Sequence, residues 1–253
     1  MKAKIIDIKD VKVACQECSL RELCLPLGLG ESDLSHLGDI VKRTRKLKKG
    51  EFIYRVGDTL TSLYAVSSGS IKTCELSAGG QIQITGFHLA GELVGVDGIS
   101  SERHHCDAVA LEPTELCELP FGNLEDVARQ VPGLQHQLFR LLSREIVQDG
   151  ELLLMVGKMN AEERLATCLL SFSRRYARLG LSGTQFRLSM SRQDLGDYLG
   201  LALETVSRLF SRFQDEGLLH IEGRDVQIAD LAGLLATAGQ SASEIDSDLK
   251  TKI

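Results

Sequence analysis

The chain has 253 residues, of which 43% are hydrophobic and 25% are charged, a composition that excludes an intrinsically disordered protein. It contains no run of the roughly 20 apolar residues that a membrane-spanning helix needs, and its first residues lack the apolar stretch of a signal peptide. We therefore expect a cytoplasmic protein of two domains that binds no membrane. A net charge of −6 excludes a general attraction to nucleic acid, so any contact with DNA must be local.

An N-terminal arm, residues 1–30, carries three of the seven cysteines. In a reducing cytoplasm, an odd number of irregularly spaced cysteines favours metal ligands or catalytic groups over disulfides. Three thiolates at the spacing C-x2-C-x5-C can bind zinc, iron or an iron–sulfur cluster, and each of these needs a fourth ligand. The cysteines of the arm are Cys15, Cys18 and Cys24. The candidates for the fourth ligand are Cys74, Cys106 and Cys117.

Residues 31–130 are predicted to form a β domain. Short β-prone segments alternate there with Gly, Ser, Asp and Pro, at the spacing of an antiparallel barrel or sandwich. The basic run "KRTRKLKK" is either a nucleic-acid patch or the solvated face of the first strand, and we favour the second interpretation. His104 and His105 could bind a metal or haem, but neighbours on a strand point to opposite faces, so we expect solvated loop residues.

A long helix is predicted over residues 134–159, within a connecting region of residues 131–160. Steps of three and four residues along it are typical of a coiled-coil seam between two copies. The seam consists of Phe139, Leu142, Ile146, Asp149, Leu153, Val156 and Asn160. Asp149 interrupts this seam. In an equally open interpretation, the seam packs on the protein's own β domain and Asp149 faces water.

Residues 161–235 are predicted to form a DNA-binding domain, followed by a flexible tail of residues 236–253. The domain opens with a helix over residues 160–180. Asn160 is placed as its N-cap, acidic residues follow in the first turn, and arginines precede Gly180.

A helix-turn-helix pattern follows in "SMSRQDLGDYLGLALETVSRLFSRFQ". Ser191 and Asp194 are spaced as a capping box, Gly200 occupies the turn, and a second helix is predicted over residues 202–216. The predicted buried face of that helix comprises Val206, Leu209, Phe210 and Phe213. The predicted outward face comprises Glu204, Thr205, Ser207, Arg208, Ser211 and Arg212. After it, "LLHIEGRDVQI" predicts the two short strands of a wing.

An exposed helix of this kind fits the major groove of DNA. Arg can donate two hydrogen bonds to guanine there, and Glu can accept one from the amino group of cytosine. Glu204 and Arg208 are four residues apart and share one face. The alternative is an ion pair on a solvated helix, worth a few tenths of a kcal/mol. The agreement of cap, turn, buried face and wing favours DNA reading.

The chain resembles the cyclic-AMP receptor protein superfamily and, within it, the oxygen-responsive FNR/Anr branch. The resemblance covers residues 15–228 and rests on "CQECSLRELCLPL", "SLYAVSSGSIK", "QITGFHLAGELVG", "CELPF", "NAEERLA" and "GDYLGLALETVSRLFSRFQ". It implies an α+β fold with an N-terminal antiparallel, jelly-roll-like β-roll that acts as a sensory domain. A long dimerisation helix and a C-terminal winged helix-turn-helix follow.

The resemblance also implies a cofactor, an oxygen-labile [4Fe–4S] cluster. Its ligands would be Cys15, Cys18, Cys24 and, in "LCELPF", Cys117. The residues that flank Cys106 do not match those that flank the distant cluster ligand in this branch. The same branch implies base reading by Glu204, Ser207 and Arg208 on a palindrome of the TTGAT-N4-ATCAA type. It further implies contact with RNA polymerase through the β domain, with Ser77–Gln81 as a candidate loop.

"GELVG" resembles the start of the phosphate-binding cassette of nucleotide-binding members of the superfamily. The Arg-Ser pair expected about a dozen residues later is replaced by His104 and His105. Because the cyclic phosphate then lacks a bidentate Arg partner, we expect no cyclic nucleotide.

In a parallel homodimer, Asp149 would face its twin between Ile146 and Leu153. The like charges would make dimerisation marginal, which provides a dimer switch. The rival interpretations are a regulator that senses haem or another small ligand, and a thiol-dependent enzyme. The chain lacks a convincing catalytic Ser-His-Asp set, P-loop or paired acid motif, so we do not expect an enzyme.

Overall fold

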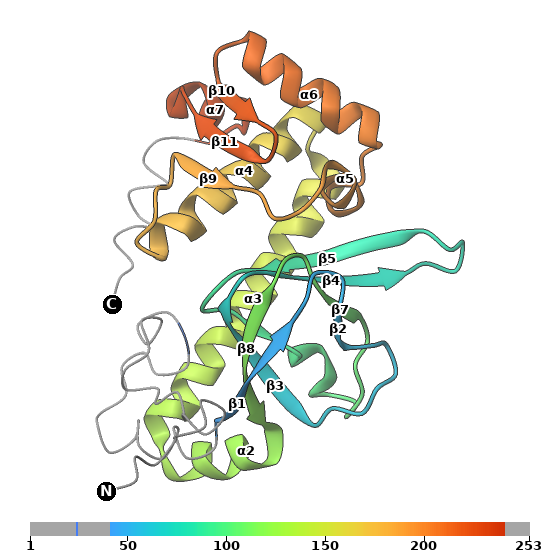
Figure 1. The fold of residues 1–253 in the computed structure, drawn as a ribbon, viewed down its shortest axis with the longest axis vertical. Helices are drawn as coiled ribbons and strands as arrows, with labels where there is room; N and C mark the ends of the chain where they lie inside the picture. Colours follow the sequence, from blue (N-terminus) through green and yellow to red (C-terminus); the bar gives the residue numbers. More distant parts are fainter. Residues whose placement is uncertain (1–23, 25–40, 241–253) are drawn as a thin grey trace, which may run out of the picture. The chain divides into compact units, whose positions relative to one another are not determined.

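The computed structural model describes residue 24 and residues 41–240, apart from the side chains of residues 42–44 (Figure 1). The chain divides into two compact units. The first contains Met1–Gly69 and Ala90–Leu142, and the second contains Ser70–Leu89 and Ser143–Ile253. Residues 70–89, which were expected in the β domain, are thus grouped with the C-terminal residues. The bounds of the domains predicted from the sequence stay predictions.

The first unit is built on antiparallel strands, as expected. One sheet has the order β1-β8-β3-β6. Its strands are β1 (Lys42–Leu47), β3 (Ser62–Ser68), β6 (Leu93–Val94) and β8 (Thr114–Pro120). In addition, β2 (Phe52–Tyr54) pairs with β7 (Asp107–Ala110). Within the four-stranded sheet, Cys117 on β8 stands opposite Thr44 on β1 and Ala65 on β3.

Two helices pack on the apolar face of this sheet. They are α2 (Phe121–Gln130) and the N-terminal part of α3 (Pro132–Lys158). In α2, Leu124 and Ala128 lie four residues apart on one face, and both are buried. The core that they complete comprises Leu63, Ala65, Leu93, Leu119, Leu124, Ala128, Val131, Leu134 and Leu141. The sequence prediction missed α2, whereas α3 confirms the long helix expected over residues 134–159.

The second unit begins with a β-hairpin, β4 (Ile71–Leu76) and β5 (Ile82–His88). After α3 comes α4 (Ala161–Arg178), whose N-cap is Asn160 as predicted. The Asn160 side chain accepts hydrogen bonds from the backbone N–H groups of Glu162 and Glu163, each at 3.0 Å. The Glu163 carboxylate accepts one in return from the Asn160 N–H at 2.8 Å, which completes a capping box.

A winged helix-turn-helix completes the second unit. Its two helices are α5 (Arg192–Leu199) and α6 (Leu203–Asp215). The wing strands β10 (Leu219–Glu222) and β11 (Asp225–Ile228) join β9 (Gln185–Arg187) in a sheet of order β10-β11-β9. A last helix, α7 (Leu231–Thr237), packs on α4. The sequence prediction missed β9 and α7. The predicted tail begins inside α7, and its residues 241–253 lie outside the described residues.

Candidate functional site

The turn between α5 and α6 is formed as the sequence predicts. The Ser191 Oγ accepts a hydrogen bond from the Asp194 N–H at 3.1 Å, and Asp194 Oδ2 accepts one from the Ser191 N–H at 2.8 Å. Gly200 ends α5 with φ 65°, a left-handed conformation that Gly adopts without strain. At Gly196 a Cβ would lie 2.6 Å from the Leu201 carbonyl oxygen, so no larger residue fits there. These constraints bring α6 close against α5.

The second helix of the motif, α6, has one buried and one exposed face. Its buried residues are the four predicted ones, Val206, Leu209, Phe210 and Phe213. Glu204, Ser207 and Arg208 are exposed. Within the described residues no ion pair joins Glu204 to Arg208, and the Arg208 guanidinium lies 3.5 Å from the Thr205 hydroxyl. The outward face therefore presents a carboxylate, a hydroxyl and a guanidinium to solvent.

Two arginines fix α5 to its neighbours. Arg192, the first residue of α5, lies with its guanidinium 3.1 Å from the centre of the Phe210 ring of α6, a cation–π contact. Burial lowers the pKa of Arg192 to about 10, which leaves it charged at neutral pH. Arg164 of α4 donates to three carbonyl oxygens, those of Val156 at 2.8 Å, Met159 at 2.9 Å and Leu199 at 2.9 Å. It thereby joins the C-terminal ends of α3 and α5.

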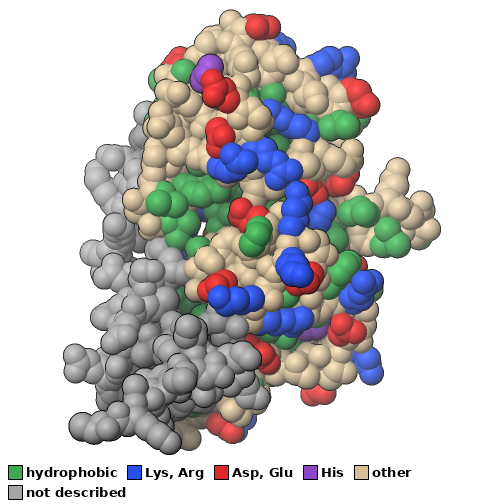
Figure 2. Space-filling view, viewed as in Figure 1, with side chains coloured by type: hydrophobic (Ala, Val, Ile, Leu, Met, Phe, Trp, Pro, Cys, Tyr) green, Lys and Arg blue, Asp and Glu red, His purple; other side chains and the backbone are tan. Residues whose placement is uncertain are grey.

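Charges of both signs are interspersed over the face of the molecule seen in Figure 2. This agrees with the net charge of −6, which gives no general attraction to DNA. On α6, the exposed Arg212 is engaged within the protein, because its guanidinium pairs with Glu216 at 2.8 Å and with Glu162 of α4. Of the two arginines of α6, Arg212 is thus held by carboxylates of the protein, whereas Arg208 is exposed and, in the part of the chain that the structure describes, forms no ion pair with Glu204.

Two of the four predicted cluster ligands lie against one core. Cys24 and Cys117 are partly buried, and both pack against the core of the first unit. The buried Gln137 side chain of α3 donates a hydrogen bond to the Cys24 carbonyl oxygen at 3.4 Å, which holds the backbone of the arm at this point. Cys15 and Cys18 lie outside the described residues. Among the residues that are described, no three His, Cys, Asp or Glu side chains form a metal site.

The other two candidates for the fourth ligand have different surroundings. Cys74 lies on β4, in the second unit. Cys106 is buried, with its sulfur 3.5 Å from Asp97 Oδ2 and 4.0 Å from the Tyr54 hydroxyl. Neither belongs to the core cluster of the first unit or to the partly buried residues that pack against it, among which are Cys24 and Cys117.

The exposed stripe of α3 coincides with the predicted seam. Phe139, Ile146 and Leu153 are 62%, 72% and 77% exposed, although each is a large apolar side chain. Asp149 is also exposed and lies between Ile146 and Leu153 on the same stripe, where partial burial raises the pKa of its carboxyl. The seam is thus only partly covered by the chain itself, because Ile146, Asp149 and Leu153 are exposed whereas Leu142 and Val156 are half-buried, and both interpretations of the seam stay predictions. An apolar stripe of this kind marks a surface for another protein chain.

His104 corrects a sequence prediction. It is not a solvated loop residue, because its side chain is buried, whereas His105 is exposed. The imidazole stacks on Tyr54 with ring centroids 3.5 Å apart, and its Nδ1 lies 3.2 Å from Asp97 Oδ1. A Cβ at Gly98 would come within 3.3 Å of the same ring. The imidazole therefore fills the space between Tyr54 and the loop that follows "GELVG".

Asp97 is the centre of this buried network. Its carboxylate also accepts hydrogen bonds from the Tyr54 hydroxyl at 3.2 Å and from the His105 backbone N–H at 2.8 Å. Burial alone would raise the pKa of Asp97, but the hydrogen bonds from His105 and His104 outweigh it and hold the pKa below its usual value. Burial raises the pKa of Tyr54, which keeps its hydroxyl protonated as a donor.

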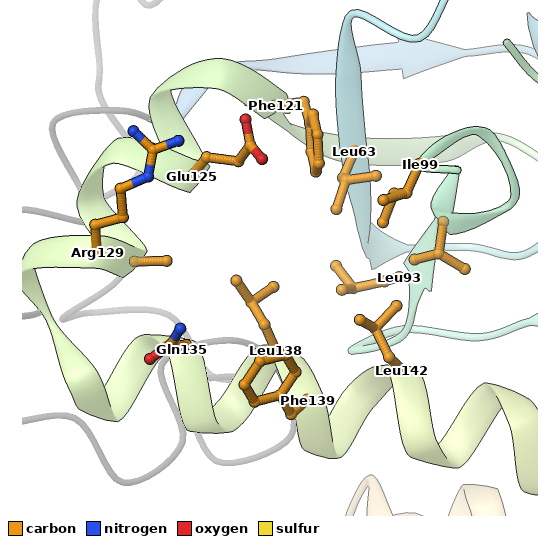
Figure 3. A pocket seen from close by; sticks show the side chains of 12 residues that line it. Leu63, Leu93, Ile99, Phe121, Glu125, Arg129, Gln135, Leu138, Phe139 and Leu142 are labelled. Carbon is orange, nitrogen blue, oxygen red and sulfur yellow. The ribbon is translucent and has the colours of Figure 1, made fainter. Parts of the chain in front are cut away.

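An apolar cavity of about 250 Å³ lies between α2, α3 and the sheet of the first unit. In Figure 3, Leu63 and Leu93 from the strands face Leu138, Phe139 and Leu142 from α3 across it. The cavity is smaller than most ligand pockets, which measure about 300–1,000 Å³. Its described lining contains no His, Cys, Met or Tyr, the residues that bind haem iron. It therefore gives no support to a haem sensor.

Known proteins share both parts of this architecture. Residues 44–131 match the cyclic nucleotide-binding domain family, and residues 163–237 match the Crp-like helix-turn-helix domain family. The transcriptional activator protein Anr of Pseudomonas protegens is 52% identical over 227 residues, which cover 90% of this chain and 93% of Anr. The chain belongs to the CRP/FNR family of transcription regulators.

Other members of the CRP/FNR family agree with this placement. The fumarate and nitrate reduction regulatory protein of Salmonella typhimurium is 45% identical over 229 residues, which cover 90% of this chain and 92% of that protein. The solved structure of FixK2 from Bradyrhizobium japonicum has a TM-score of 0.72 and 30% identity, and it covers 79% of this chain and all of FixK2. The family consists of regulators rather than enzymes, and membership implies DNA binding and dimerisation. Within the described residues, no helix has both the length and the apolar character to cross a membrane.

Proposed function

We propose that this chain is an oxygen-sensing transcription regulator of anaerobic metabolism. Without oxygen it holds a [4Fe–4S] cluster, dimerises and binds a palindrome of the TTGAT-N4-ATCAA type, and in air it is an inactive monomer. The names of two relatives, the anaerobic regulatory protein of Haemophilus influenzae and the fumarate and nitrate reduction regulatory protein, support the link to anaerobic regulation.

The observation that carries this proposal is the packing of Cys24 and Cys117 against the same core. With Cys15 and Cys18, they make a set of four thiolates, the usual ligands of a [4Fe–4S] cluster. When bound, the cluster supplies an oxygen-labile centre. The chain's own contribution is to hold the Cys24 backbone through Gln137 and to keep Cys117 on a paired strand.

The test is the composition of protein purified without air. We expect a brown protein with iron and sulfide in equal amounts, whose visible absorption is lost on exposure to air. Cys117→Ser should abolish the absorption, and the matched Cys106→Ser should retain it. The reverse pattern would assign the fourth ligand to Cys106. Colourless, metal-free wild-type protein that still binds the palindrome would contradict the proposal as a whole.

For DNA reading we propose Glu204, Ser207 and Arg208. Their exposure on α6 and the burial of the opposite face support this role. A two-fold dimer would present two copies of α6 to successive major grooves, which matches a palindromic site.

For the dimer switch we propose Ile146, Asp149 and Leu153. The two apolar side chains are exposed on one stripe, so a second copy could cover them, and the Asp149 carboxylate lies between them. Two such carboxylates facing each other would oppose dimerisation.

We also propose that no cyclic nucleotide binds. His104 stands where nucleotide-binding members carry an Arg, and its ring is stacked on Tyr54 and hydrogen-bonded to Asp97. At this place the chain therefore has a filled space and the half-buried carboxylate of Asp97, instead of a guanidinium for the phosphate. Isothermal titration with cyclic AMP should show no heat of binding, and saturable binding would refute this part.

RNA polymerase is the remaining proposed partner, with the loop Ser77–Gln81 as the contact. The loop is exposed, and the flanking Leu76 and Ile82 are 71% and 50% exposed, as suits a surface that meets another protein. Shortening this loop should reduce transcription in vitro without weakening DNA binding. Unchanged transcription would remove the loop from the contact.

A further inference from the structure

The β4–β5 hairpin packs on the DNA-binding helices within the second unit. The ring of Phe87, on β5, lies 5.9 Å from that of Phe172 on α4 and 5.0 Å from that of Tyr198 on α5, measured between centroids. The Arg175 guanidinium of α4 donates to the Phe87 carbonyl oxygen. Gln83 adds a hydrogen bond at 3.4 Å to the Tyr198 carbonyl oxygen. These contacts place the hairpin against both helices.

Two polar contacts join the hairpin to the start of α5, one just before the helix and one in its first turn. The Ser70 hydroxyl donates to the Ser189 hydroxyl at 2.7 Å, two residues before the N-cap. The Lys72 ammonium lies 2.5 Å from Asp194 Oδ1, at the third position of the helix. The side chains of Lys72 and Asp194 are only 20% and 15% exposed. Salt screens a pair of this kind less than a fully exposed one.

Asp194 divides its two oxygens between two tasks. Oδ2 accepts from the Ser191 N–H at 2.8 Å and from the Ser191 hydroxyl at 2.6 Å, and Oδ1 accepts from Lys72. Burial by itself would raise the pKa of Asp194, but the hydrogen bonds from Lys72 and Ser191 hold the pKa below its usual value. Removing the Lys72 charge would therefore leave the capping box of α5 in place and would break only the ion pair that joins the first turn of α5 to the hairpin.

The first helix of the motif is thus held at both ends. Lys72 holds its first turn, and Arg164 binds the Leu199 carbonyl oxygen at its last residue. Movement of α5 carries α6 with it, because the close approach at Gly196 and the contact of Arg192 with Phe210 join the two helices.

We propose that Lys72 is a positioning residue for DNA reading, through which the β4–β5 hairpin fixes the orientation of the helix-turn-helix. This proposal rests on the DNA binding proposed above. It adds Lys72, a residue that lies far from the recognition helix α6 in the sequence, to the residues on which DNA reading depends. In a dimer, each recognition helix must meet its half-site at a set separation. Loss of the Lys72–Asp194 pair would widen the range of orientations that α6 samples.

The first test needs no DNA. Amide hydrogen exchange is measured on the full chain for wild type, Lys72→Met, Lys72→Arg and the matched control Lys46→Met. Lys46 forms an exposed pair with Glu115 at 2.8 Å. In Lys72→Met, exchange should rise in β5 and in the first turn of α5 by about two- to thirtyfold, with rescue in Lys72→Arg. Unchanged exchange would overturn the proposal. A rise that extends to β10, β11 and α7 would also overturn it, because Lys72 would then stabilise the whole unit.

The second test compares operators whose half-sites are separated by four or by five base pairs. Wild type should favour the four-base-pair spacer, and the ratio of the two affinities should fall about two- to thirtyfold in Lys72→Met. An equal loss of affinity for both operators would overturn the positioning role. A smaller fraction of correctly folded protein would weaken binding to both operators by the same factor. If wild type itself shows no preference, the palindrome of the proposed function is wrong, and the exchange result still decides the role of Lys72.

Discussion

Replacing Asp149 by Ala should let the chain dimerise in air. Asp149 lies on the exposed stripe with Ile146 and Leu153, so a second copy that covers the stripe brings two carboxylates together. At a separation of about 4 Å, two unit charges repel by about 1 kcal/mol in water and about 4 kcal/mol at an effective dielectric constant near 20. Because 1.4 kcal/mol is a factor of ten in an equilibrium constant, Asp149→Ala should strengthen dimerisation about fivefold to a thousandfold.

The assay is analytical ultracentrifugation of aerobic, metal-free protein over a range of concentrations, with binding to the palindrome measured on the same samples. The matched control is Glu151→Ala, which removes an exposed carboxylate two residues further along the same helix. An Asp149→Ala protein that remains monomeric in air would refute the repulsion argument. If Glu151→Ala strengthened dimerisation equally, the net charge of the chain would be the cause, rather than the position of Asp149 in the seam.

Three further outcomes can be measured. Arg208→Ala should weaken operator binding by about 1–3 kcal/mol and relax the preference at one base pair, whereas equal weakening on every sequence would make Arg208 a phosphate contact. Phe213→Ala should destabilise the protein by about 3–5 kcal/mol in calorimetry, because the ring is fully buried, and Leu153→Ala at an exposed position should leave the unfolding temperature of the monomer nearly unchanged. In air, the dimer fraction of wild type should rise as the pH is lowered towards the raised pKa of Asp149. Burial already raises the pKa of Asp149 and a facing twin would raise it further, so the dimer binds protons more tightly. Asp149→Ala should lack this dependence, and an unchanged pH dependence would remove Asp149 from the switch.

The helix-turn-helix could be predicted closely because its signals are local. The spacing of Ser191 and Asp194 gives the start of α5, and Gly200 gives its end. The second helix, expected over residues 202–216, runs from Leu203 to Asp215. In each case the residues that decide the structure lie within a few positions of one another, where periodicity and capping rules apply.

The missed elements depend on distant contacts. Helix α2 starts after Pro120 without a side-chain cap, and it is held by burial of Leu124 and Ala128 against the sheet. Strand β9 has three residues and exists through pairing with β11. His104 was misplaced because its burial depends on contacts with Tyr54 and Asp97, and Tyr54 lies far from it in the sequence. The pair of Lys72 with Asp194 joins positions 122 residues apart, beyond the reach of any periodic pattern.

The separation of faces on α6 bears on how this regulator can change its target. Val206, Phe210 and Phe213 hold the helix in place, while Glu204, Ser207 and Arg208 add nothing to its packing. Substitutions at such exposed positions usually alter stability by no more than about 0.5 kcal/mol. If these three exposed residues read the operator as proposed, new operator sequences are accessible through a few surface exchanges on an unchanged scaffold, and duplicated copies of such a gene can diverge in the promoters they recognise without loss of the fold.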